Sequence, residues 1–126
     1  MKTEGFEQLT VYKLAYGLAM KIFHASKDFP KEEKYALIDQ IRRSSRAVCA
    51  NLAEAYRKRQ YPKHYASKMS DADGECSETS VWLSFSCDCK YLTLEQYEPL
   101  RSECQEIGKM LGYMMAHPAE FGVKMD

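Results

Sequence analysis

Apolar residues recur along the chain every three or four positions, which is the spacing of a helix that buries one side. The pattern predicts four helices over residues 9–27, 31–59, 62–90 and 94–116. The second has no internal glycine or proline, and its apolar or small side chains form one narrow stripe. That stripe contains Ile38, Ile41, Ser45, Val48, Leu52 and Ala55. The corresponding residues of the third helix are Tyr65, Met69, Ala72, Cys76, Thr79, Leu83 and Ser86.

Short segments separate the four patterns, and each carries a signal that ends or begins a helix. Pro30 biases Phe29 away from the helical region, and Pro62 suits the first position of a helix. Thr93 and Gln96 match a capping box, in which each side chain accepts a hydrogen bond from the other residue's backbone N–H. Because short connections force neighbouring helices to run in opposite directions, the sequence predicts an all-α, antiparallel up-down-up-down four-helix bundle.

Length and composition are those of one globular domain, residues 1–126. A chain of 126 residues can bury roughly two-thirds of its unfolded surface, and no apolar run approaches the ~20 residues that span a bilayer. The first residues lack the apolar core of a signal peptide, so we expect a cytoplasmic protein. The five cysteines are scattered through the helical patterns, where free core thiols are expected rather than a disulfide framework.

Charge is balanced over the whole chain but unevenly distributed. Residues 39–68 contain eight lysines and arginines against two acidic residues, whereas residues 69–126 contain four against eleven. Two interpretations follow from this asymmetry. Either the basic helix contacts nucleic acid, or basic and acidic helices neutralise each other within the fold.

The antiparallel arrangement places arginines of the second helix level with glutamates of the third. Arg43 then lies level with Glu78, and Arg46 lies level with Glu75. An arginine fork suits partly buried pairing with a carboxylate better than lysine does. The expected interhelix ion pairs join Arg42 or Arg43 to Glu78, and Arg46 to Glu75.

A second group of cations surrounds the turn between the second and third helices, with few acidic residues in reach. We expect this group, the basic tip, to be exposed and to offer contacts to phosphates. Its members are Arg57, Lys58, Arg59, Lys63 and Lys68, and the neighbouring Tyr61 or Tyr65 is available for stacking on a base.

Several short motifs occur in order along nearly the whole chain. They are Phe6-x-x-Leu9-x-Val11-Tyr12-Lys13-Leu14-Ala15, Phe29-Pro30-x-x-Glu33-x-Tyr35-x-Leu37, Gln40-Ile41-Arg42-Arg43-Ser44-Ser45, Asn51-Leu52-Ala53-Glu54, Ala72-x-Gly74-x-x-x-Glu78 and Tyr91-Leu92. Together they resemble the four-helix bundle family encoded by intervening sequences in bacterial large-subunit ribosomal RNA genes, formerly described as ribosomal proteins. The chain has Cys49 where members usually have proline and Ala55 where they usually have glycine, so we expect a straighter second helix.

The resemblance implies a homo-oligomer, with a pentameric ring as the expected form. A relative with this architecture is the accessory variability protein of diversity-generating retroelements, a basic pentamer that engages nucleic acid and a reverse transcriptase. The resemblance therefore suggests association with nucleic acid, with RNA as the expected ligand, and it implies no reaction.

Aromatic residues outside the predicted core stripes give separate support for assembly. A bundle helix in a monomer needs only one buried stripe, and the first and third helices carry additional aromatic side chains. These residues either contact another protomer or widen the core. The expected interface residues are Tyr12, Tyr16, Trp82 and Phe85.

No catalytic, metal or cofactor site is predicted. The three histidines lie in separate segments without a metal-ligand partner one turn away, and Cys87 and Cys89 lie on different faces of a helix. The chain has neither the Glu-x-x-His motif of di-iron bundles nor a glycine-rich phosphate loop. We therefore expect a non-enzymatic protein without a cofactor.

Two hypotheses for function remain open. In the first, a homo-oligomeric bundle associates with RNA through the basic tip, and repetition of the tip around a ring raises avidity. In the second, the bundle is a scaffold that binds another protein through its helix faces, and the tip is merely solvated. The zero net charge weighs against the first hypothesis, because dedicated nucleic-acid binders usually carry a basic excess.

Overall fold

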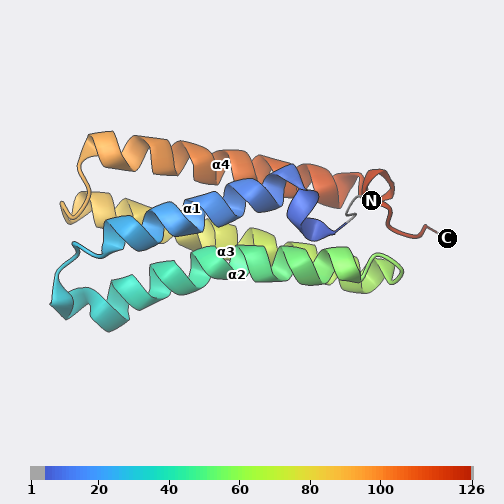
Figure 1. Ribbon diagram of the computed structural model, residues 1–126, viewed down its shortest axis with the longest axis horizontal. Helices are drawn as coiled ribbons and strands as arrows, with labels where there is room; N and C mark the ends of the chain where they lie inside the picture. Colours follow the sequence, from blue (N-terminus) through green and yellow to red (C-terminus); the bar gives the residue numbers. More distant parts are fainter. Residues whose placement is uncertain (1–4, 126) are drawn as a thin grey trace.

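Four long helices pack side by side in the computed structural model, which describes residues 5–125 (Figure 1). They are α1 (Thr10–Ser26), α2 (Asp39–Arg57), α3 (Pro62–Asp88) and α4 (Leu94–Ala116). Successive helices run in opposite directions, so α1 begins, α2 turns into α3, and α4 ends at the same end of the bundle. Residues 5–125 contain no strand, and the predicted all-α four-helix bundle is confirmed.

The helix faces predicted from spacing form the core. All seven residues assigned to the core face of α3, from Tyr65 to Ser86, are buried. The six residues of the stripe in the second helix are also buried. In α1 the same spacing of apolar residues places five of them in the core, whereas Leu14 and Phe23 are only half-buried. Helical periodicity therefore identified the core faces of α2 and α3 fully, but it also included Leu94 at the start of α4, which is 67% exposed.

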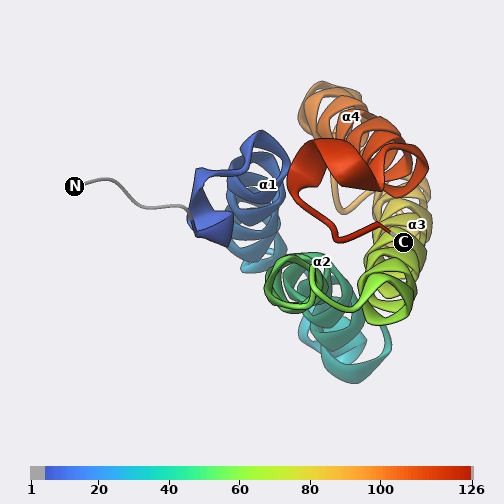
Figure 2. The ribbon, with the colours of Figure 1, turned by 90° about the vertical axis from the view of Figure 1, so that its right-hand side faces the viewer.

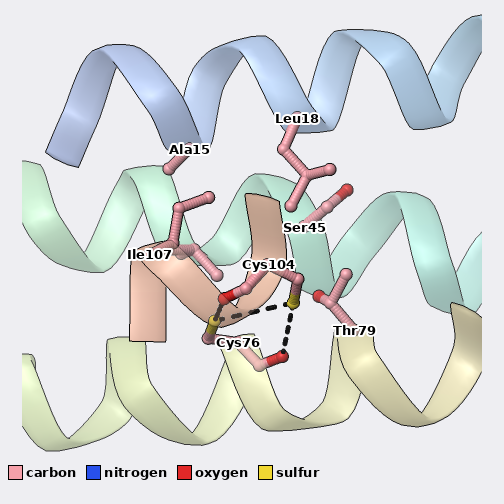
Figure 3. A pocket seen from close by; sticks show the side chains of 8 residues that line it. Ala15, Leu18, Ser45, Cys76, Thr79, Cys104 and Ile107 are labelled. Atoms are coloured by element: carbon pink, nitrogen blue, oxygen red, sulfur yellow. Dashed lines mark hydrogen bonds between the residues drawn. The ribbon is translucent and has the colours of Figure 1, made fainter. Parts of the chain in front are cut away.

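Small side chains allow α3 to approach its neighbours closely in the middle of the bundle. The hydroxyls of Thr79 on α3 and Ser44 on α2 are hydrogen-bonded at 2.8 Å. The sulfur atoms of Cys76 on α3 and Cys104 on α4 lie 3.8 Å apart (Figure 3). The cavity that remains there measures only about 10 Å³, so the centre of the bundle has no room for a ligand.

The helix predicted over residues 31–59 is interrupted near its start. Lys31–Glu33 (η2) form a 3-10 turn and Lys34–Ile38 (η3) form a π-helix, after which α2 runs from Asp39. A π turn contains an extra residue and shifts the phase of the helix. Two consecutive residues, Leu37 and Ile38, are both buried there. The α-helical spacing of the sequence did not indicate this shift.

The other helix boundaries follow the local signals. α3 begins at Pro62. The capping box at the start of α4 is present, with Gln96 Oε1 accepting from the Thr93 N–H at 2.9 Å and Thr93 Oγ1 accepting from the Gln96 N–H at 3.1 Å. α4 continues through Pro99. No helix in the described part of the chain is both long and apolar enough to cross a membrane.

The chain beyond α4 turns back across the end of the bundle. Pro118–Phe121 (η4) form a 3-10 turn, and Val123 is buried. The backbone N–H of Lys124 donates to the carbonyl of Arg59 at 2.8 Å. Figure 2 shows this segment lying across the open end of the four helices. The C-terminal segment is thus tied to the α2–α3 turn, which carries the basic tip.

Candidate nucleic-acid interface

The basic tip is built on a tight connection between α2 and α3. α2 ends at Arg57, and Lys58 leaves the helical region with φ −101° and ψ 22°. The Tyr61 N–H donates to the Lys58 carbonyl at 2.8 Å, and α3 starts at the next residue. Because the connection is short and hydrogen-bonded, the tip is a fixed platform, on which Arg57, Lys58 and Lys63 are exposed.

Arg59 belongs to the fold rather than to the exposed tip, which corrects the prediction. Its Nε donates to the Tyr56 carbonyl at 2.8 Å, and a terminal nitrogen donates to the Phe121 carbonyl at 3.2 Å. The guanidinium carbon lies 3.6 Å from the centroid of the Tyr56 ring. Gly122 has a φ of +83°, and a Cβ at that position would lie 2.8 Å from an Arg59 nitrogen. Arg59 therefore clasps the C-terminal segment.

Lys68 also has a partner. Its Nζ lies 2.9 Å from a carboxylate oxygen of Glu54 on α2. The hydrogen bond between the two groups is the main reason that the pKa of Glu54 is lowered and the pKa of Lys68 is raised. A phosphate would have to compete with Glu54 for this lysine. Lys68 is therefore a weaker candidate for a phosphate contact than the sequence predicted.

Three cations of the predicted set have no such partner in the described chain. Across residues 5–125, no carboxylate lies within ion-pair distance of Arg57, Lys58 or Lys63. An approaching anion would not have to break an ion pair to reach them, although Lys58 adds to the effect of Lys68 in lowering the pKa of Glu54. From here on the basic tip means these three residues.

The two tyrosines proposed for stacking differ in exposure. Tyr61 is 58% exposed, and its ring centroid lies 5.9 Å from that of His64. Tyr65 is buried in the core, and its hydroxyl donates to the Met114 carbonyl at 3.3 Å. Burial raises the pKa of Tyr65 to about 12. Only Tyr61 is therefore accessible to a base at the tip.

The glutamates of α3 pair with one arginine of α2. A terminal nitrogen of Arg43 lies 3.2 Å from Glu75 and the same nitrogen contacts Glu78. The hydrogen bond to Glu75 is the main cause of a raised pKa for Arg43. Arg43, and not Arg46 as expected, therefore pairs with Glu75.

Arg42 and Arg46 lie one turn apart on α2 and face α1 instead of α3. Arg42 donates from Nε to Ser26 Oγ at 2.8 Å and from a terminal nitrogen to the Phe23 carbonyl at 3.4 Å. These bonds cap the C-terminal end of α1. The guanidinium carbons of Arg42 and Arg46 lie 4.8 and 5.7 Å from the centroid of the Phe23 ring. Arg46 is exposed and, in the described chain, pairs with no carboxylate.

The four aromatic residues expected at an oligomer interface border two separate hollows of the surface. Tyr12 and Tyr16 lie between α1 and α2, and the Tyr12 ring packs edge-on against Phe6 at 5.1 Å. Trp82 and Phe85 lie between α3 and η3, with ring centroids 6.1 Å apart. Tyr16 and Phe85 are 55% and 53% exposed. The indole N–H of Trp82 is buried and has no hydrogen-bond partner among residues 5–125.

The cysteines and acidic residues do not form a metal site. Among residues 5–125, no three potential metal ligands come together, and all five cysteines are free. Burial raises the pKa of the Cys49 thiol to about 11. The hydrogen bond with Cys104, together with burial, raises the pKa of the Cys76 thiol. Thiols that resist ionisation are poor nucleophiles.

Comparison with known proteins identifies relatives of the whole bundle. A crystal structure of a protein of unknown function from the S23 ribosomal protein family of Bacteroides thetaiotaomicron is similar at 29% sequence identity and a TM-score of 0.76. The match covers 84% of this chain and 95% of that chain. No curated protein matches the sequence. A family model described as "23S rRNA-intervening sequence protein" matches residues 7–113, and the chain therefore belongs to the 23S rRNA-intervening sequence protein family.

Proposed function

We propose that this chain forms a non-enzymatic homo-oligomer that associates with RNA through its basic tip. The observation that carries the proposal is the state of Arg57, Lys58 and Lys63. All three are exposed in or directly beside the short α2–α3 connection, and no carboxylate in the described chain pairs with them. Cations of this kind contact phosphates and release the counterions of the nucleic acid.

One tip alone provides few phosphate contacts. Three contacts would lower the affinity only about 20- to 40-fold between 50 and 200 mM salt, from a slope of roughly −0.7 to −0.9 per contact. A ring of protomers presents several tips at once, and simultaneous contacts multiply the effect. Oligomerisation is therefore part of the proposal, with a pentamer as the form suggested by the family resemblance.

The exposed aromatic pair on α3 is the proposed protomer interface. Phe85 is half exposed, and the buried indole N–H of Trp82 has no partner in the part of the chain that the structure describes. An interface would cover the exposed ring of Phe85 and would supply an acceptor close to the indole N–H of Trp82. Phe85→Glu should reduce the particle mass measured by light scattering while helical circular dichroism is retained. An unchanged mass would reject this surface as the interface.

The RNA proposal is tested by measuring affinity against salt. For an oligomer that uses six or more phosphate contacts, affinity for RNA should fall by about 10³ or more between 50 and 200 mM salt. The double substitution Lys58→Gln/Lys63→Gln should flatten the slope. A wild-type protein that binds no RNA at micromolar concentration and low salt would eliminate this function and favour the scaffold hypothesis.

A further inference from the structure

We propose that the ligand is single-stranded RNA, whose bases stack on Tyr16 and Tyr12 in the groove between α1 and α2 while its phosphates contact Arg46 and Arg57. The inference rests on the RNA association proposed above and names the form of RNA and a second part of the site. It gives Tyr12 and Tyr16 a different role from the oligomer contact that their sequence positions suggested.

The groove has the dimensions and the lining of a stacking site. It encloses about 400 Å³ between α1 and α2 and opens to solvent. Tyr16 is more than half exposed, and its ring centroid lies 6.0 Å from that of Tyr12. On the α2 side the groove is bordered by the small side chains of Ala50 and Ala53, which leave the tyrosine rings accessible. Exposed aromatic rings beside a cation, here Arg46, are a platform on which unpaired bases stack.

Arginines stand at two positions along the same face of α2. Arg46, Ala50, Ala53 and Arg57 follow one another at steps of four, three and four residues, so they share one side of the helix. The two arginines are separated by about 16 Å along the helix axis. A few nucleotides of single strand span that length, with bases over the tyrosines between the two guanidinium groups.

Charge favours a phosphate as the group that meets Arg46. Arg46 borders both the aromatic groove and a neighbouring hollow of about 500 Å³, whose charged lining residues are three arginines and one acidic residue, Asp39. Arg43 is neutralised by the glutamates of α3, whereas Arg46 pairs with no carboxylate among residues 5–125. A purely apolar partner would cover this charge without compensation, which costs free energy.

The groove and the basic tip follow one another along α2. Arg57 belongs to the tip and lies one turn beyond Ala53, which lines the groove. One strand can therefore contact Lys58 and Lys63 at the turn and continue along α2 past Arg57 toward Arg46. A duplex would reach the cations of the tip but would keep its bases stacked inside the helix. Single-stranded RNA uses both parts of this surface.

Binding of a labelled oligouridine and of an RNA duplex of equal length to the full chain tests the proposal. Tyr16→Ala should weaken oligouridine binding about tenfold, the loss expected for one stacked base, and leave duplex binding unchanged. Tyr16→Phe keeps the ring and should restore the affinity. Arg46→Gln should weaken oligouridine binding and reduce its salt dependence. Tyr35→Ala, which removes a tyrosine that is 74% exposed on η3, is the matched control and should have no effect.

Three outcomes separate the two proposals. If Lys58→Gln/Lys63→Gln weakens RNA binding but Tyr16→Ala and Arg46→Gln do not, the tip binds RNA and the groove assignment is overturned. A lower particle mass for Tyr16→Ala would show that a second copy of the chain fills the groove, which also overturns it. Absence of any RNA binding by the wild-type protein removes the proposed function itself.

Discussion

The two ends of the bundle are closed by different sets of contacts. At the α2–α3 end, Arg59 bonds to the carbonyls of Tyr56 and Phe121 and holds the C-terminal segment. At the other end, the Tyr91 hydroxyl donates to Glu33 at 2.7 Å, and the Tyr91 ring lies 5.5 Å from that of Phe29. A phenol on a carboxylate is found at both ends, because the Tyr113 hydroxyl donates to Glu120 at 2.6 Å at the α2–α3 end. The α2–α3 end adds the cation of Arg59 on backbone carbonyls of two segments.

The two ends also differ in the acidic residues around their cations. At the first end the carboxylate of Glu120 accepts from Tyr113, and in the described chain it pairs with none of the cations of the basic tip. The second end has two glutamates among its lysines, because η2 consists of Lys31, Glu32 and Glu33. At both ends lysines lie outside ion-pair distance of any carboxylate of residues 5–125. The ends differ because Glu32 and Glu33 directly follow Lys31, whereas the acidic residue nearest before Lys58 is Glu54, which is bonded to Lys68. The comparison teaches that the partners of a cation, rather than the number of cations, define a surface that can bind phosphate.

The largest effect is expected at Arg59. Arg59→Ala removes two charge-assisted hydrogen bonds and the contact with the Tyr56 ring, and should lower the free energy of unfolding by about 2–3 kcal/mol. Arg57→Ala removes an exposed cation of the same helix end and should change it by less than about 0.5 kcal/mol. Urea unfolding monitored by circular dichroism measures both. Equal losses for the two variants would show that Arg59 does not clasp the C-terminal segment.

A smaller effect is expected at Gly122, the residue packed against Arg59. Gly122→Ala places a Cβ at positive φ and against the guanidinium, which should cost about 1–2 kcal/mol. Gly17→Ala in α1 is the matched control, because a Cβ there meets no atom within 4 Å. It should stabilise the protein by about 0.5–1 kcal/mol. Thermal unfolding of the two variants should shift in opposite directions, and a shared direction would contradict this assignment.

The smallest effect is expected at the opposite end. Lys90 follows α3 and has a φ of 66°, a conformation that favours glycine over a residue with a side chain. Lys90→Gly should therefore stabilise the protein by about 0.5–1 kcal/mol. Destabilisation of that size in urea unfolding would mean that the Lys90 side chain contributes more than its strained backbone costs.

The sequence was sufficient wherever a feature depends on neighbours within one helix. The buried face of α3 from Tyr65 to Ser86 follows from spacing alone, and the capping box of Thr93 and Gln96 depends on two nearby residues. Each of these features is set by the local geometry of a helix, so its residues could be named before the structure was known.

Features that depend on contacts between distant segments could not be named in advance. Arg59 donates to the carbonyl of Phe121. Every residue has a backbone carbonyl, so the sequence does not indicate which of them will accept this hydrogen bond. The register between α2 and α3 was estimated correctly enough to bring Glu75 and Glu78 to an arginine. The rotation of α2 about its axis was not known. That rotation brings Arg43 close to Glu75 and turns Arg46 toward α1.

Charge reversal at the two ends tests the central claim most directly. Lys58→Glu/Lys63→Glu alters the basic tip, and Lys27→Glu/Lys31→Glu makes the same change in net charge at the opposite end, on residues that are also exposed. If the tip contacts RNA, the first variant should lose at least about tenfold in affinity at 50 mM salt, while the second stays within a few-fold of the wild type. Equal losses would show that binding follows net charge alone, and would contradict a site at the tip.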